Sequence, residues 1–307
     1  MAEVIDDAAP ALAGIIVPLV TPLQSTDAVD YAALELLLER VISGGASGIF
    51  LLSTCGEGAS LSYRLRRELI AHTCRQVNGR VPVLVNITDT SPAETTAIAI
   101  SAAEAGAEFA VLAPPYYLPL SQAELTEYVL RRLAECPLPL MLYNMPELTK
   151  VAIAATTVRR LMDERAIIGL KDSSGNLDYF AQLCALKRHR AGWSLLMGPE
   201  HLLVESVERG GNGGVCGGAN LFPELFVGIY TAAAGDGSRL PELLATAERL
   251  EEIYLTEPPS AASVIKGLKQ GLACLGIGNG RVAEPLGEVA PEGKARIQAI
   301  MKQLANK

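Results

Sequence analysis

The sequence predicts an α/β fold, a (β/α)8 barrel with a C-terminal helical extension. Eight short apolar runs alternate with helical patterns, and their starts lie about 20 to 34 residues apart. Most runs are apolar throughout, as in a parallel sheet that helices cover on both faces. The eight units end near residue 234, close to the ~250 residues of a typical TIM barrel. An open doubly wound sheet is the alternative.

The predicted strands and helices follow one another in a regular order. The strands are expected at 14–20, 48–52, 81–87, 109–112, 138–143, 167–171, 194–197 and 213–217. Apolar stripes predict helices at 31–42, 63–77, 154–162, 177–189 and 202–209. Two further helices begin at the capping boxes 91–94 and 121–124. We expect a catalytic barrel over 1–234 and an all-helical domain over 235–307 that packs on its outside.

The composition indicates a globular protein that binds neither nucleic acid nor membranes. Half of the 307 residues are apolar, and the formal net charge is −8, with a pI near 5.1. Negative charge opposes binding to nucleic acid and to anionic lipid. The apolar runs are also shorter than the ~20 residues of a transmembrane helix.

Cysteine and histidine usage predicts the compartment and the type of chemistry. The six cysteines show no C-x-x-C spacing, and the acidic segment 1–10 lacks the regions of a signal peptide. These features predict a reducing, cytoplasmic location. Three scattered histidines are too few for a metal site. We therefore expect catalysis without a metal or a bound cofactor.

Reactive side chains cluster where the predicted strands end. In a barrel of this type the active site lies at the C-terminal ends of the strands. The candidates at these positions are Thr54, Cys55, Glu57, Tyr116, Tyr117, Tyr143, Asn144, Lys171, Glu200 and His201.

Lys171 is the candidate nucleophile, because it directly follows the apolar run 167–170. Removal from water disfavours an ammonium ion, so more neutral amine is available to attack a carbonyl and form a Schiff base. Tyr143 ends the neighbouring predicted strand, where a phenol could relay protons. Alternatively, Lys171 reaches solvent and pairs with Asp172 or Glu200, and Tyr143 is a core aromatic residue.

Two glycine-containing segments lie at strand ends. Segment 53–58 is rich in hydroxyl groups, and its amides could hold a carboxylate; a plain turn that uses glycine for positive φ is the alternative. Segment 210–218 lacks the order of a phosphate-binding loop, so we interpret it as a tight eighth strand that a ligand can approach.

Three segments together resemble the dihydrodipicolinate synthase and N-acetylneuraminate lyase superfamily of pyruvate-dependent class I aldolases. They are Ser-Thr-Cys-Gly-Glu at 53–57, Tyr-Asn-Met-Pro at 143–146 and Gly-Leu-Lys-Asp-Ser-Ser-Gly-Asn at 169–176. Their order and their places after the second, fifth and sixth strands match the family. The resemblance covers nearly the whole chain.

The resemblance implies a role for each catalytic candidate. Lys171 would form a Schiff base with pyruvate or with the 2-keto carbon of a substrate, and no other cofactor would be needed. Tyr143 would relay protons, with Thr54 next in the relay. Tyr117 would reach across a dimer interface into the neighbouring site, which implies a homotetramer built as a dimer of dimers.

The resemblance also implies a substrate-binding set: Cys55, Gly56, Glu57, Leu148, Ser173, Gly198, Val215 and Gly217. The 56–57 pair would fix the turn that presents amides to the pyruvyl carboxylate. Cys55 replaces the usual threonine and is a poorer hydrogen-bond donor. Ser173 lies where sugar-acid aldolases place a hydroxyl group, whereas Gly217 replaces a serine of neuraminate lyases.

Leu148 indicates the branch of the family. Dihydrodipicolinate synthases carry an arginine at this place, which grips the carboxylate of aspartate semialdehyde, and losing such a contact costs about 1.5–3 kcal/mol. We therefore expect a lyase that reversibly cleaves a 2-keto-3-deoxy sugar acid, or a related 4-hydroxy-2-oxo acid, into pyruvate and an aldehyde. Dihydrodipicolinate synthase and a 2-keto-3-deoxy acid dehydratase are alternatives, and a non-catalytic keto-acid sensor is an alternative from another class.

Overall fold

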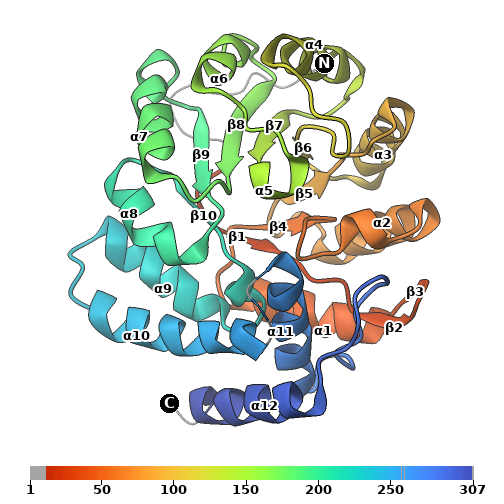
Figure 1. The fold of residues 1–307 in the computed structure, drawn as a ribbon, viewed down its shortest axis with the longest axis vertical. Helices are drawn as coiled ribbons and strands as arrows, with labels where there is room; N and C mark the ends of the chain where they lie inside the picture. Colours follow the sequence, from red (N-terminus) through yellow and green to blue (C-terminus); the bar gives the residue numbers. More distant parts are fainter. Residues whose placement is uncertain (1–11, 257, 259, 306–307) are drawn as a thin grey trace.

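Eight parallel strands close into a barrel that helices surround (Figure 1). The computed structural model describes residues 12–305 except 257 and 259, so the predicted absence of a leader in segment 1–10 lies outside the described residues. The strand order is β1-β10-β9-β8-β7-β6-β5-β4, and every neighbouring pair is parallel. The predicted (β/α)8 barrel is confirmed, and the open doubly wound sheet is wrong.

Each predicted strand overlaps one barrel strand. The barrel strands are β1 (Gly14–Pro18), β4 (Gly48–Leu51), β5 (Val83–Asn86), β6 (Phe109–Leu112), β7 (Leu140–Asn144), β8 (Ile167–Asp172), β9 (Ser194–Met197) and β10 (Gly213–Val215). A small antiparallel hairpin, β2 (Leu23–Ser25) and β3 (Ala28–Val29), was not predicted, because its strands are too short to show a pattern.

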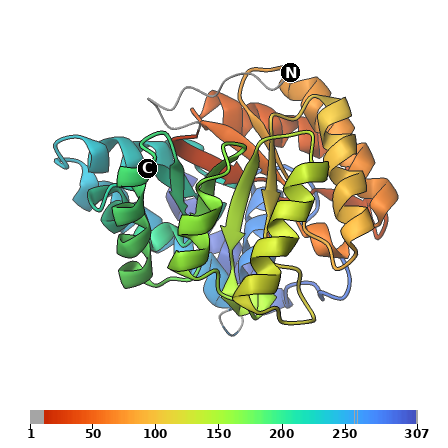
Figure 2. The same cartoon turned by 90° about the horizontal axis from the view of Figure 1, so that it is seen from above.

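Helices alternate with the strands and lie outside them, as Figure 2 shows from above. They are α1 (Tyr31–Ser43), α2 (Tyr63–Val77), α3 (Pro92–Ala105), α4 (Gln122–Glu135), α5 (Pro146–Thr149), α6 (Ala155–Leu161), α7 (Leu177–Leu186), α8 (Leu203–Glu208) and α9 (Pro223–Ala234). Short 3-10 helices are η1 (Gly58–Ser60), η2 (Lys187–His189), η3 (Glu200–Leu202) and η4 (Gly217–Asn220).

One of the two predicted capping boxes is complete. At the start of α4, Ser121 Oγ accepts from the Glu124 amide, and the Glu124 carboxylate accepts from the Ser121 amide at 2.8 Å. At the start of α3, Ser91 caps the Glu94 amide, but the Glu94 carboxylate lies 3.3 Å from Arg67 instead. The prediction of a full box at 91–94 is therefore wrong, because an arginine on α2 competes for the carboxylate.

The segment after residue 234 is largely helical, as predicted. It contains α10 (Leu240–Glu251), η5 (Glu252–Thr256), α11 (Ala261–Cys274) and α12 (Pro291–Ala305). Helix α10 packs on α9, whereas α11 reaches η4 at the C-terminal end of β10 (Figure 1). This segment therefore contacts the barrel end as well as its flank. The domain boundary at residue 234 stays a prediction.

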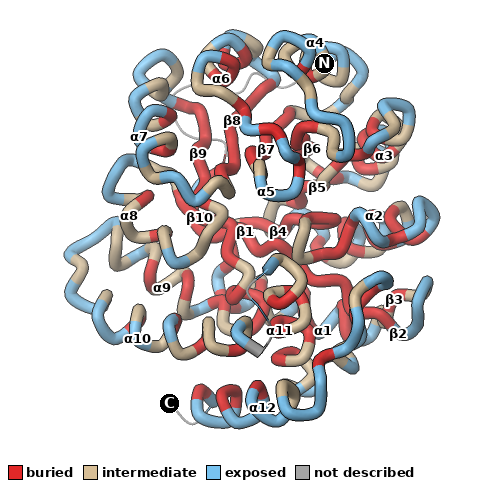
Figure 3. The backbone as a smooth tube through the Cα atoms, viewed as in Figure 1, coloured by how far each residue is buried: buried red, intermediate tan, exposed pale blue. Residues whose placement is uncertain are grey.

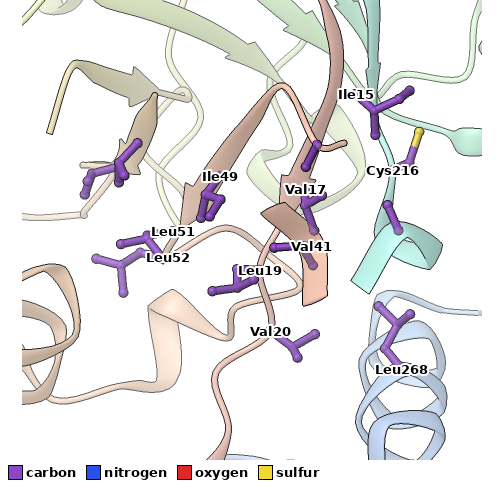
Figure 4. Packing of buried hydrophobic residues seen from close by; sticks show 14 of the residues in the cluster. Ile15, Val17, Leu19, Val20, Val41, Ile49, Leu51, Leu52, Cys216 and Leu268 are labelled. Atoms are coloured by element: carbon purple, nitrogen blue, oxygen red, sulfur yellow. The ribbon is translucent and has the colours of Figure 1, made fainter. Parts of the chain in front are cut away.

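The barrel strands are buried on both faces (Figure 3). Ile16, Phe50 and Tyr143 belong to a cluster inside the barrel. Ile15 and Val17 belong to the larger cluster between strands and helices, part of which Figure 4 shows. The continuous apolar runs in the sequence follow from burial on both faces.

The described residues lack two features that would indicate particular partners. Within 12–305, leaving out 257 and 259, no helix is long and apolar enough to cross a membrane. The same residues hold no group of three or more histidine, cysteine, aspartate or glutamate side chains that could bind a metal ion.

Candidate active site

Lys171 and Tyr143 meet at the C-terminal ends of β8 and β7. The two residues are partners in the strand register. Lys171 Nζ lies 4.0 Å from the centroid of the Tyr143 ring and 5.3 Å from that of Phe50. Lys171 is only 6% exposed, so its amine lies among aromatic rings and does not reach bulk solvent.

A register shift in β8 turns Lys171 toward the inside of the barrel. Leu140 pairs with Ile167, but Met141 pairs with Gly169, so β8 holds one extra residue. Ile167 belongs to the outer cluster, and strict alternation would place residue 171 on the same outer face. Because a one-residue slip reverses the faces, the bulge brings Lys171 to the inner rings.

The alternative ion pairs of Lys171 are both wrong. The Asp172 carboxylate accepts from Asn144 Nδ2 at 2.8 Å and from Ser174. The Glu200 carboxylate accepts from the Gly218 amide at 2.8 Å and from the Tyr254 hydroxyl at 3.0 Å. Within the described chain, no hydrogen bond or ion pair holds Lys171 Nζ.

Asn144 and Asp172 connect the C-terminal ends of β7 and β8 by a hydrogen bond on the outer side of the barrel. They are the register pair that follows Tyr143 and Lys171. Burial raises the pKa of Asp172, and its hydrogen bonds from Asn144 and Ser174 oppose that rise. Asn144 Oδ1 also accepts from the Ile153 amide at 3.0 Å. This network fixes the spacing of the strand ends that carry Tyr143 and Lys171.

Thr54 joins the loop after β4 to Tyr143. Its Oγ1 lies 3.4 Å from the Tyr143 hydroxyl, a long hydrogen bond in which either group can donate. The sequence-predicted neighbours Lys171, Tyr143 and Thr54 are therefore brought together from three strands.

The loop over 53–58 has an unusual backbone. Leu52 and Glu57 both have φ of 55°, in the left-handed region that non-glycine residues rarely adopt. Glycine instead allows two parts of the backbone to lie close together, because a Cβ on Gly58 would lie 2.1 Å from the Leu52 carbonyl oxygen. Positive φ is therefore not the reason for the glycines of this turn, and its role as a carboxylate site stays a prediction.

Cys55 is a neutral thiol close to two other loops. Burial raises its pKa to about 11, although nearby Lys171 opposes the rise. A Cβ on Gly217 would lie 3.7 Å from Cys55 Sγ and 3.8 Å from Glu200 Oε2. The loops after β4, β9 and β10 therefore meet at this point.

The Glu57 side chain is occupied within the chain. Its Oε2 accepts from Lys269 Nζ at 2.5 Å, and its Oε1 accepts from the Ala283 amide at 2.5 Å. Any contact of segment 56–57 with a substrate must therefore use the backbone, as the resemblance implied.

Three further predicted residues lie at the ends of β8, β9 and β10. The Ser173 amide donates to the Asn144 carbonyl at 2.8 Å. A Cβ on Gly198 would lie 1.9 Å from Ser173 Oγ, so this contact requires glycine. Val215 belongs to the cluster inside the barrel.

Tyr117 and Leu148 are exposed. Tyr117 is 87% exposed and has φ of 88°, so it contacts little of its own chain. Leu148 is 41% exposed on α5. Neither residue is held in place by the core.

Glu200, which the sequence suggested only as an ion-pair partner of Lys171, is a buried acid beside the candidate site. Burial raises its pKa to about 7, and its bonds from Gly218 and Tyr254 oppose the rise. Its position directly after the seventh predicted strand placed it among the candidates at the active-site end of the barrel. Tyr254 carried no signal, because it lies in η5 outside the barrel.

The chain is similar to known proteins over nearly its full length. Residues 11–304 match the model of the Dihydrodipicolinate synthetase family. A 4-hydroxy-tetrahydrodipicolinate synthase of Neisseria gonorrhoeae is 31% identical over 295 residues, which cover 95% of this chain and 98% of that protein. A probable 2-dehydro-3-deoxy-D-pentonate aldolase of Escherichia coli is 29% identical, with 94% and 96% covered.

The structural similarity is equally extensive. The solved structure of dihydrodipicolinate synthase from Bacteroides thetaiotaomicron superposes with a TM-score of 0.92 and 42% identity, and it covers 96% of this chain and 99% of that one. The predicted resemblance and the predicted enzyme class, a lyase, are confirmed. This chain belongs to the dihydrodipicolinate synthetase family of pyruvate-dependent class I aldolases and lyases.

Proposed function

We propose that this protein reversibly cleaves a 2-keto-3-deoxy sugar acid, or a related 4-hydroxy-2-oxo acid, into pyruvate and an aldehyde. The observation that carries the proposal is the unpaired Lys171 amine, buried 4.0 Å from the centroid of the Tyr143 ring. An amine without an anionic partner is available to bond with a carbonyl carbon.

The proposed reaction uses Lys171 as nucleophile and Tyr143 as acid and base. The amine adds to the C2 carbonyl, and the carbinolamine loses water to give an imine. Tyr143 takes the proton of the C4 hydroxyl, the C3–C4 bond breaks, and the aldehyde leaves while the electron pair forms an enamine. Protonation of C3 gives the pyruvyl imine, which water hydrolyses. Thr54, 3.4 Å from the Tyr143 hydroxyl, passes the proton onward.

The keto acid's carboxylate would be held by backbone amides of the loop after β4. The protonated Cys55 thiol is a weak donor, so the amides of Thr54 and Cys55 supply the main hydrogen bonds. No metal or further cofactor takes part in the proposed steps, because the imine on Lys171 stores the electron pair.

The groups near the aldehyde end favour a hydroxylated, uncharged partner. Leu148 offers no charge to a second carboxylate, whereas Ser173 and Glu200 offer polar oxygens. The pKa of Glu200, raised to about 7, lets its carboxyl group be protonated and donate to a hydroxyl near neutral pH.

Dihydrodipicolinate synthesis is the second candidate. The names of the Neisseria and Bacteroides relatives favour it, whereas the Escherichia coli relative is named as an aldolase. Leu148 speaks against it, because a synthase would need another cation for the carboxylate of aspartate semialdehyde.

We also propose that the active form is a homotetramer in which Tyr117 enters the site of the neighbouring chain. Its support is the exposure of Tyr117 and Leu118, at 87% and 69%, on a backbone that Tyr117 holds at positive φ. Native mass spectrometry should give the mass of four chains.

Borohydride trapping with pyruvate tests the proposed function. We expect a pyruvyl adduct on Lys171 in the wild type and none in Lys171→Met. Turnover with hydroxylated aldehydes and pyruvate should exceed turnover with aspartate semialdehyde. The opposite preference would favour the synthase, loss of water without cleavage would favour the dehydratase, and an adduct with no turnover would favour the keto-acid sensor.

A further inference from the structure

A buried ion pair joins the active-site loop to the C-terminal segment. Lys269 on α11 and Glu57 have side chains that are 3% and 1% exposed, and Nζ lies 2.5 Å from Oε2. The two residues are 212 positions apart in the chain. The second carboxylate oxygen accepts from the Ala283 amide, so one side chain holds two parts of the C-terminal segment.

The loop that Glu57 anchors depends on outside support. Left-handed Leu52 and Glu57 flank its turn, and such residues cost roughly 1–3 kcal/mol each unless surrounding contacts fix them. Within the loop, the Glu57 amide donates to the Thr54 carbonyl at 3.1 Å, and the Gly58 amide donates to Ser53 at 3.3 Å. The Glu57 carboxylate is the connection from this loop to α11.

Helix α11 also contacts the opposite side of the site. Figure 4 shows the side chain of Leu268, midway along α11, beside the short helix η4 that follows Cys216, and a Cβ on Gly217 would lie 3.3 Å from Leu268 Cδ1. Adjacent residues of α11 therefore touch the loops after β10 and β4. A shift of α11 would move both sides of the site.

We infer that Lys269 is a positioning residue: through Glu57 it holds the loop over 53–58 in the shape that binds the carboxylate of the keto acid. The inference rests on the proposed function. Lys269 does not touch the substrate; it fixes Glu57, which fixes the amides of Thr54 and Cys55. The C-terminal segment thereby sets the affinity for pyruvate.

Few titratable groups face this ion pair. From the loop itself, Cys55 is close to Glu57, and its thiol stays neutral up to about pH 11. Arg281 lines the same small cavity as Lys269. Burial lowers the pKa of Lys269, and the Glu57 carboxylate opposes that fall. A pH effect specific to the pair therefore comes from Lys269.

Pyruvate titration of borohydride trapping tests this inference on the full chain. In Lys269→Met, we expect at least a tenfold rise in the half-saturating pyruvate concentration, with wild-type trapping at saturation. In Glu57→Gln, we expect a similar rise that shrinks as pH increases, because burial lowers the pKa of Lys269 and the amine then loses its charge. Both variants are compared with the wild type at each pH.

The double variant Glu57→Gln/Lys269→Met should raise the half-saturating pyruvate concentration no further than Lys269→Met does, because both substitutions break the same contact. It carries no unpaired buried charge and should show no pH trend. If a single variant does not fold, the double variant is measured in its place. Lys294→Met is the matched control, because Lys294 pairs with Glu288 at 2.9 Å on the surface. This substitution should leave the half-saturating pyruvate concentration unchanged.

Three results would overturn the inference: wild-type half-saturation in Lys269→Met, equal losses at every pH in Glu57→Gln, or additive losses in the double variant. If the wild type gives no adduct on Lys171, the proposed function fails instead, and the two failures are thus distinct.

Discussion

Two buried lysines, one in the barrel and one in the C-terminal segment, have opposite surroundings. Lys171 is 6% exposed and lies over the rings of Tyr143 and Phe50, with no anion bonded to it in the described chain. Lys269 is 3% exposed and pairs with Glu57. A buried amine that has a carboxylate partner remains an ammonium ion and ties segments together, whereas an unpaired amine is free to bond with a substrate.

Removing the phenol beside Lys171 should give the largest effect. We expect Tyr143→Phe to lower kcat by about 10²–10⁴-fold, the usual contribution of a positioned acid and base. The pyruvyl adduct should still form on Lys171, because the amine is unchanged. Steady-state kinetics and adduct mass measure the two effects separately.

Tyr230→Phe on α9 is the matched control and should leave kcat near the wild-type value. Wild-type turnover in Tyr143→Phe would assign proton transfer to another group, with Thr54 the nearest candidate at 3.4 Å from the Tyr143 hydroxyl.

The effect of each lysine on stability should differ strongly. Lys269→Met leaves the Glu57 carboxylate buried without a partner, which should lower the free energy of unfolding by about 3–5 kcal/mol. Lys171→Met removes a buried polar amine that no anion holds in the described chain, and it should leave stability unchanged or raise it. Urea denaturation measures both. An equal loss of unfolding free energy in the two variants would show that Lys171 also has a structural partner.

The strands could be predicted from sequence, but the orientation of Lys171 could not. Burial on both faces leaves continuous apolar runs, which are visible without coordinates. The bulge at β8 leaves no such trace, because Ile167, Ile168 and Leu170 are all apolar whichever face they occupy. Only the register with β7 shows that Lys171 faces inward.

The contacts of the C-terminal segment were equally hidden. Segment 53–57 could be recognised as a site element from its residues and its place after a strand. Its partners Lys269 and Tyr254 lie in helices without a motif, and Glu57 and Lys269 are 212 positions apart. Contacts over such distances depend on how the helices pack, which the local pattern does not determine.

The two buried acids Glu57 and Glu200 differ in the same way as the two lysines. Replacing Glu200 should give the smallest of the predicted effects, a change in how stability depends on pH. Glu57 has a cation, whereas Glu200 has hydrogen-bond donors but no ion pair in the described chain, and burial raises its pKa from 4.5 to about 7. The folded state therefore holds a proton that the unfolded state releases between these values. Stability from this group is present below about pH 4.5 and is lost as pH rises through 7, by up to about 3 kcal/mol.

Glu200→Gln keeps the neutral shape, since its oxygen can accept from the Gly218 amide and its nitrogen can donate to Tyr254. We expect equal stability at pH 5 and a more stable variant at pH 8, measured by urea denaturation at both values. Glu292→Gln on the exposed side of α12 should leave the pH dependence unchanged. A constant difference between wild type and Glu200→Gln from pH 5 to 8 would mean that Glu200 stays ionised, and its carboxylate would then accept hydrogen bonds from a hydroxylated substrate without donating one.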